Sequence, residues 1–316
     1  VADALPLLNQ AQALALPAFD GRQLYFEVDT ADLAPGDWKA EVRLRGLEKA
    51  DLAATTTLSV KVWPAKLPEK QSLGLCQWGY VHTSMLKDQP KTALKDQVRH
   101  GTNVFVSLFP PKATFDKDGN IEGDLDFKEH DAYLDEYARY GLILFYTYDA
   151  ALKGPEKPFS DSWNKAHIEY LHRWVAHLQE RGMDYKDWAL YTIDEPGLKQ
   201  GLVDIHVKLG KLAREADPKI QIYVDPVGDA SLDDLKEMAP YVDIWCPHRN
   251  GIVNRPDPEK LNFIKSTGKQ VFTYECQGDV KHRSPIAYYR GQAWLAWMHE
   301  LQAIGFWTYC TSQYDP

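Results

Sequence analysis

The sequence predicts an α/β fold, a (β/α)8 barrel of the TIM type, preceded by a small antiparallel β module similar to part of a β-sandwich. After about residue 70, strand-like runs alternate with helical stretches, a pattern typical of a parallel sheet covered by helices. The runs number eight, and eight strands close such a barrel. A doubly wound open sheet is the alternative, but no Gly-x-Gly-x-x-Gly follows the first run and no phosphate-binding loop occurs.

The first part of the chain has a different pattern. Residues 23–64 contain three runs in which apolar and polar residues alternate, QLYFEVDT, DWKAEVRLRG and TTTLSVKVWP, separated by turn residues. Alternation with period two is typical of antiparallel strands. The Pro- and Lys-rich segment WPAKLPEKQ then interrupts the pattern. We therefore expect a β module over residues 1–68 and a barrel domain over residues 69–316.

The barrel strands are predicted from short apolar runs. They lie at residues 72–80, 102–111, 141–149, 187–195, 219–227, 242–250, 269–277 and 304–312. The stretches between them are amphipathic; one predicted helical face carries Ile168, Leu171, Trp174, Val175 and Leu178. The sequence stops at TSQYDP, just past the eighth run, so we expect the closing eighth helix to be cut away or replaced by another element.

Composition argues against several classes of protein. Of 316 residues, 44% are hydrophobic and 26% charged, which is ordinary for a soluble domain. The net charge of −9 argues against nucleic-acid binding, and no apolar run approaches the roughly 18 residues of a membrane span. Four cysteines without Cys-x-x-Cys spacing are expected to be buried small residues, and their redox state stays open: Cys76, Cys246, Cys276 and Cys310. We predict no metal and no other cofactor.

The chain begins at Val1 without an initiator methionine or a signal-peptide pattern, which indicates a processed chain. We expect a secreted or periplasmic protein, with a cytoplasmic location left open. The oligomeric state is not predicted.

The ends of the predicted strands carry acids and aromatic rings, and active sites of such barrels form at the carboxyl ends of the strands. In order, these ends are Trp78 and Tyr80, Phe109 and Pro110, Tyr148 and Asp149, Asp194 and Glu195, Asp225, His248 and Asn250, Tyr274 and Glu275, and Trp307 and Tyr309. No Gly-x-Ser-x-Gly or His-Glu-x-x-His motif occurs, which argues against serine acyl hydrolysis and zinc peptidase chemistry. Carboxylates among flat rings favour cleavage of a glycosidic bond, because sugar rings stack on aromatic faces and the reaction needs a positioned acid.

The stretch LYTIDEPG, at the end of the fourth predicted strand, places two acids side by side. Capping of a following helix is one reading, because an acid before proline is a common helix start. Catalysis is the other. Adjacent side chains diverge at a strand end, so one acid can hold the 2-acetamido group of a substrate while the other reaches the leaving oxygen.

Three segments make the sequence similar to glycoside hydrolase family 123 and its uncharacterised relatives: LYTIDEP, KQVFTYECQGDV and YYRGQAWLAWMHELQAIGFWTYCTSQYDP. The resemblance covers about residues 70 to 316. It implies a retaining, exo-acting β-N-acetylgalactosaminidase that uses substrate assistance. On this resemblance Glu195 is the general acid/base, and Asp194 orients the acetamido group as it forms an oxazolinium ion.

Two alternatives remain open. In the large clan of barrel glycosidases that act with two carboxylates, an acid on strand four works with a glutamate nucleophile on strand seven. Glu275 lies at the end of the seventh predicted strand, so it is either that nucleophile, with Glu195 as acid/base, or a sugar ligand or structural acid. A non-catalytic carbohydrate-binding barrel is the other alternative, because a fold alone does not establish chemistry.

Further residues are candidates for contact with a glycan. Arg290 can hold a carboxylate in the site or form an ion pair elsewhere. The other candidate substrate-binding residues are Trp78, Tyr148, Asp225, Trp245, His248, Asn250, Tyr274, Glu275, Trp307 and Tyr309. Asp116 and Asp149 are interpreted as loop acids.

Overall fold

The computed structural model describes residues 24, 26–47, 53–66, 68, 71–147, 154, 156–254, 258–276 and 286–310. The chain divides into two compact units, one covering Asp3–Lys70 and the other holding Gln71–Pro316.

The N-terminal unit contains an antiparallel hairpin. Strand β1 (Gly36–Arg45) pairs with β2 (Ala53–Val62), and Trp38 lies opposite Val60. Residues 26–30, part of the first predicted run, form no strand. In the described residues, the predicted module is therefore a two-stranded sheet, smaller than the partial sandwich that we expected.

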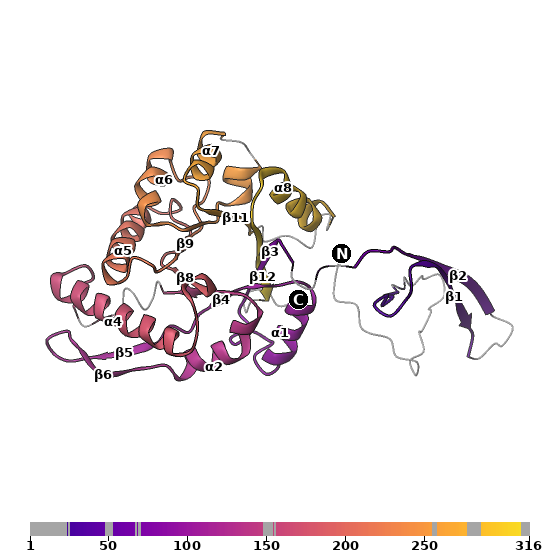
Figure 1. The fold of residues 1–316 in the computed structure, drawn as a ribbon, viewed down its shortest axis with the longest axis horizontal. Helices are drawn as coiled ribbons and strands as arrows, with labels where there is room; N and C mark the ends of the chain where they lie inside the picture. The colour runs from indigo at the N-terminus through magenta and orange to yellow at the C-terminus, as the bar shows by residue number, and fades with distance from the viewer. Residues whose placement is uncertain are drawn as a thin grey trace. The chain divides into compact units, whose positions relative to one another are not determined.

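The second unit is a closed barrel of parallel strands, which confirms the predicted fold (Figure 1). Its strands are β3 (Gly74–Gly79), β4 (Val104–Ser107), β7 (Leu142–Tyr146), β8 (Trp188–Tyr191), β9 (Ile222–Val224), β10 (Ile244–Trp245), β11 (Gln270–Glu275) and β12 (Ala303–Cys310). They follow one another around the barrel in chain order, and β12 closes it by pairing with β3. Each predicted run overlaps one of these strands, and all but the last contain theirs in full.

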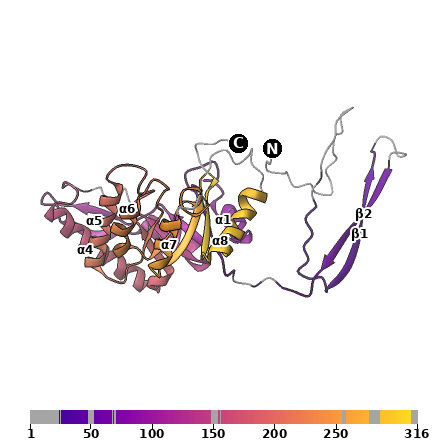
Figure 2. The same cartoon turned by 90° about the horizontal axis from the view of Figure 1, so that it is seen from above.

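Helices surround the barrel (Figures 1 and 2). They are α1 (Pro90–Arg99), α2 (Lys128–Tyr137), α4 (Asp161–Glu180), α5 (Leu202–Ala216), α6 (Leu232–Met238), α7 (Pro258–Ser266) and α8 (Gly291–His299). The described residues also contain short helical turns. Three are 3-10 helices: η1 (Ala138–Tyr140), η2 (Tyr185–Asp187) and η3 (Ala239–Tyr241). Two are π-helices: η4 (Arg249–Val253) and η6 (Ile286–Arg290). Within the described ranges, no helix combines the length and the apolar character that crossing a membrane requires.

An antiparallel hairpin, β5 (Lys112–Phe115) and β6 (Ile121–Asp126), lies between β4 and α2 in the chain and was not predicted. The carboxylate of Asp116 accepts the backbone N–H groups of Asp118 and Asn120 and so stabilises the turn of this hairpin. Asp116 is the loop acid that we expected.

Helix α4 illustrates how the sequence specifies the outer layer. Its first turn is capped by Ser160, whose hydroxyl accepts the backbone N–H of Trp163 at 3.4 Å. Its buried residues recur every three or four positions and pack on the barrel: Trp163, Ala166, Tyr170, Leu171, Trp174, Val175 and Leu178. Ile168, which we predicted for the same face, is partly buried.

The strands are buried on both faces. In β8, Ala189 and Tyr191 belong to the core inside the barrel, whereas Trp188 and Leu190 pack against the helices. Two-sided burial explains the continuous apolar runs. Because neighbouring side chains point to opposite faces, only alternate residues of each strand face the barrel interior.

Candidate active site

The two acids of LYTIDEPG lie at the carboxyl end of β8 and both line one pocket. They do not begin a helix, because α5 starts only at Leu202 and the turn after β8 separates them from it. Glu195 adopts a left-handed backbone conformation with φ of 49°, so the alternation of side chains along the strand does not continue through it. The next turn is tight: a Cβ on Gly197, whose φ is 101°, would lie 2.8 Å from the backbone nitrogen of Ala230.

Asp225 connects the acid pair to the sheet. The backbone N–H of Glu195 donates to Asp225 Oδ1 at 3.1 Å. The hydroxyl of Tyr191 contacts Asp225 Oδ2 and lies 2.7 Å from Asp194 Oδ1. Asp225 is only 3% exposed, and burial raises its pKa well above the usual range, with the charge of Asp194 acting in the same direction.

A neutral Asp225 satisfies all three contacts. Its Oδ1 accepts the backbone N–H, its protonated Oδ2 donates to the oxygen of Tyr191, and the Tyr191 hydroxyl then donates to Asp194. Burial also raises the pKa of Asp194, and the neighbouring Glu195 adds to that shift, while the hydrogen bond from Tyr191 opposes it. The network therefore directs one hydrogen-bond donor at Asp194 and keeps the carboxyl group facing the pocket.

Glu195 is held from the opposite side of the pocket. The hydroxyl of Tyr274, on β11, donates to Glu195 Oε1 at 2.5 Å. Burial raises the pKa of Tyr274 far above its usual value, so this hydroxyl stays protonated. The thiol of Cys276 lies 3.9 Å from the same oxygen, and burial raises its pKa to about 12, which leaves it a neutral neighbour rather than a nucleophile.

Glu275 does not reach this pocket, which corrects its assignment as a substrate-binding residue. Along β11 the alternate residues Phe272 and Tyr274 line the pocket, as does Cys276 just past the strand, so Glu275 points the other way. Its side chain is fully enclosed, with its Oε2 3.6 Å from the Nε of Arg249. In this arrangement its carboxylate cannot attack a sugar in the pocket.

Arg249 was missed by the sequence analysis, which singled out Arg290 instead. Arg290 is exposed on η6 and does not line the pocket. Arg249 lies between His248 and Asn250 in the sequence, and both of these were candidate substrate-binding residues. No feature of the sequence marks Arg249 as different from the other arginines. Only its partly buried position beside Glu275 identifies it as the partner of an acid at the strand ends.

Three other candidates lie outside the pocket and are also corrected. Trp245 is fully buried in the layer between barrel and helices, where its indole donates to Thr267 at 3.2 Å. Asn250 lies on η4 and accepts a hydrogen bond from Asn254. Tyr309 donates its hydroxyl hydrogen to Asp96 at 2.8 Å.

His248 supports the pocket from behind. Its ring meets the ring of Tyr274 edge-on, with centroids 4.9 Å apart, and its Nε2 lies 3.3 Å from the sulfur of Cys276. It therefore positions pocket residues without lining the pocket itself. Tyr148 and Asp149 lie outside the described residues.

The pocket has a volume of about 320 Å³, in the range of small-ligand sites. At its upper level lie the two acids and the rings of Trp78, Tyr80, Tyr274 and Trp307. Besides the buried Asp225, other lining residues are largely apolar and come from strands around the whole barrel: Cys76, Val106, Leu144, Tyr223, Cys246, Phe272 and Ile304. The site thus combines diverging carboxyl groups, aromatic walls and an apolar floor. The part of the chain that the structure describes contains no group of three or more His, Cys, Asp or Glu side chains placed to hold a metal ion.

No protein-family model and no curated protein matches the sequence. Among solved structures, the chain is similar to an intracellular xylanase from Thermoanaerobacterium saccharolyticum, with 14% identity and a TM-score of 0.50 over 75% of this chain and 86% of that one. An endoxylanase from a sugarcane soil metagenome has 10% identity and the same TM-score and coverage. An exo-β-1,4-mannosidase from Opitutaceae bacterium strain TAV5 has 10% identity and a TM-score of 0.50, over 75% of this chain and 52% of that one. At these identities the likeness shows the (β/α)8 fold.

Proposed function

We propose that the protein is a retaining glycoside hydrolase that cleaves a β-linked N-acetylhexosamine, with N-acetylgalactosamine favoured, by substrate-assisted catalysis. One observation carries the proposal: Asp194 and Glu195 line the same pocket from one strand end but are held by opposite walls, Asp194 through Tyr191 and Glu195 through Tyr274. Two of the similar structures, a xylanase and an exo-β-1,4-mannosidase, support glycosidase chemistry on this fold.

In the first step, Glu195 acts as the acid. Tyr274 occupies Oε1, so Oε2 carries the proton that passes to the glycosidic oxygen as the bond from that oxygen to the anomeric carbon breaks. The carbonyl oxygen of the substrate's acetamido group attacks the same carbon and forms the oxazolinium ion. Asp194 accepts the acetamido N–H and stabilises the positive charge that develops on the ring.

In the second step, the ionised Glu195 takes a proton from water, whose oxygen attacks the anomeric carbon and reopens the oxazolinium ring. Two inversions at that carbon give net retention. The apolar floor of the pocket suits the acetamido methyl group, which loses contact with water there. The enclosed position of Glu275 supports this route over the two-carboxylate alternative, in which a second carboxylate must reach the sugar.

Hydrolysis of an aryl β-N-acetylgalactosaminide tests the proposal. We expect Glu195→Gln to lower kcat about 10² to 10⁴-fold, as loss of a general acid does. Glu275→Gln serves as the matched control, because it removes a buried acid of the same type that does not line the pocket. Comparable losses for both variants on an aryl glycoside without an acetamido group would favour the two-carboxylate mechanism. Binding of the sugar without turnover by the wild type would favour a non-catalytic barrel.

A further inference from the structure

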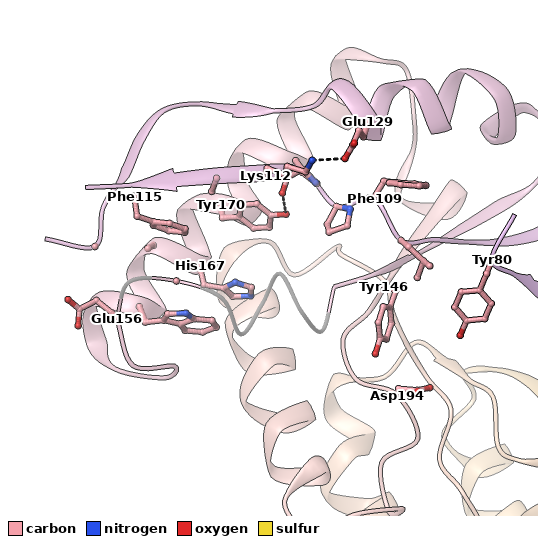
Figure 3. A pocket seen from close by; sticks show the side chains of 18 of the residues that line it. Tyr80, Phe109, Lys112, Phe115, Glu129, Tyr146, Glu156, His167, Tyr170 and Asp194 are labelled. Atoms are coloured by element: carbon pink, nitrogen blue, oxygen red, sulfur yellow. Dashed lines mark hydrogen bonds and ion pairs between the residues drawn. The ribbon is translucent and has the colours of Figure 1, made fainter. Parts of the chain in front are cut away.

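A second cavity, of about 680 Å³, adjoins the pocket that holds the acid pair (Figure 3). The two share Trp78, Tyr80 and Asp194 as lining residues, so they adjoin at these side chains. The cavity extends over the ends of β4 and β7 toward the β5–β6 hairpin and α4. No residue of this hairpin was assigned a function from the sequence.

Flat rings form much of the wall of this cavity. Phe115, from the hairpin, and His167 and Tyr170, from α4, line it together (Figure 3). The rings of His167 and Trp163 stack 4.8 Å apart with an angle of 11° between their planes. The Tyr170 hydroxyl donates to the backbone oxygen of Pro111 at 2.7 Å, so this polar atom is already bonded within the protein.

Polar groups occur at the edges of the cavity. Lys112 and Glu129 form an ion pair of 2.6 Å, Glu156 lies at the left of the view in Figure 3, and Asp194 lies below Tyr146. Burial lowers the pKa of His167 to about 4, so its ring is neutral at neutral pH. Ring faces bordered by carboxylates and an ammonium group suit a glycan, which presents apolar ring faces and hydroxyl groups together.

The position of Glu195 indicates which part of a glycan the cavity would hold. Glu195 lines only the smaller pocket, where its carboxyl is bonded to Tyr274 of β11. In the closed barrel, β11 lies opposite β7, whose end borders the larger cavity. The leaving oxygen must lie at Glu195, whereas Asp194, at the junction of the two cavities, faces the acetamido side of the sugar.

We propose that this second cavity binds sugar units attached to the non-reducing side of the cleaved N-acetylhexosamine, so that the enzyme acts within a glycan chain. This inference rests on the function proposed above and replaces the exo action expected from the sequence. Stacking of such sugar units on the rings of this cavity, Phe115 among them, removes apolar surface from water, and we expect it to raise the affinity for the glycan about tenfold.

The test compares two aryl glycosides with the same leaving group. One carries a single β-N-acetylgalactosamine, and the other carries one further sugar on its O3 or O4. We expect kcat/KM to be about tenfold higher for the longer substrate, because the added contacts stabilise the transition state. Both substrates undergo the same bond cleavage, so an effect on the chemical step changes both kcat/KM values equally and cancels in their ratio.

Phe115→Ala should lower this ratio toward one. Thr114→Ala is the control, since Thr114 is exposed on the same strand and does not line the cavity, and it should leave the ratio unchanged. Thermal melting checks that both variants fold. If the short substrate is turned over and the longer one has an equal or lower kcat/KM, the extended site is overturned but the proposed function is not. The same holds if Phe115→Ala leaves the ratio of the two kcat/KM values unchanged. If neither substrate is hydrolysed, the proposed function is wrong, and this inference, which rests on it, is wrong as well.

Discussion

Replacing Asp225 by Asn tests the protonation state on which the organisation of the acid pair depends. The amide retains both contacts of a neutral Asp225, because its oxygen accepts the Glu195 N–H and its NH2 group donates to Tyr191. The substitution removes only the titration. The pH dependence of stability therefore reports whether Asp225 is neutral in the folded protein.

The expected magnitude follows from the direction of the pKa shift. An aspartate in the unfolded chain titrates near 3.8, and burial raises the folded pKa of Asp225 well above that value. Between the two values the folded protein holds a proton that the unfolded chain has released. The free energy of unfolding must then decrease as pH rises, by about 1.4 kcal/mol per pH unit. The Asn variant lacks this titration, so its free energy of unfolding relative to that of the wild type should increase from pH 5 to pH 7.

Urea unfolding at pH 5 and at pH 7 measures this difference. Asp225→Ala is the companion variant: it also removes the titration, but it leaves the Glu195 N–H and the Tyr191 hydroxyl without their buried partner. It should therefore be less stable than the Asn variant by about 2 to 4 kcal/mol at both pH values. Parallel stability curves for the wild type and the Asn variant would show that Asp225 is ionised in the fold, and the proposed direction of the hydrogen bonds would be wrong.

Three further predictions concern the pocket. Tyr274→Phe removes the hydroxyl that holds Glu195, so kcat/KM for an aryl glycoside should fall about tenfold; an unchanged value in steady-state kinetics would contradict a role for this bond. Asp194→Asn removes the charge that faces the proposed oxazolinium ion, and kcat should fall about 10² to 10³-fold, whereas a small effect would contradict substrate assistance. Glu275→Gln leaves the partly buried Arg249 without its counter-charge, so the free energy of unfolding should fall by about 3 kcal/mol in urea titration. If Glu275→Gln is inactive but as stable as the wild type, Glu275 is again a candidate catalytic residue.

Much of the barrel could be predicted because its strands are short, apolar and evenly separated by amphipathic helices. The β5–β6 hairpin was overlooked, although KATF and IEGDLD flank a turn with Asp, Gly and Asn. These strands are more polar than the barrel strands and therefore do not stand out beside them. The larger cavity could not be predicted either, because it depends on how this hairpin and α4 face one another in space.

The candidate site was predicted only in part, for a reason that follows from the barrel strands. The sequence places residues at strand ends, but a strand buried on both faces gives no signal of which residues point inward. Trp245 and Glu275 therefore looked equivalent to Trp78 and Tyr274, yet both point away from the pocket. The Asp194–Glu195 pair could be located because two adjacent acids at a strand end are unusual in any orientation.

The contrast between the ends of β8 and β11 explains how two consecutive acids can serve one pocket. At β11 the alternation of an extended strand sends Tyr274 inward and Glu275 outward. After β8 the same alternation would leave one acid outside, but the left-handed backbone of Glu195 breaks it and brings both acids to the pocket. Such a conformation costs about 1 to 2 kcal/mol for a residue other than glycine, so other contacts must stabilise it. Asp225 provides one by accepting the N–H of Glu195, and through Tyr191 it also holds Asp194. A single buried carboxyl group therefore fixes the backbone of one acid and the side chain of the other.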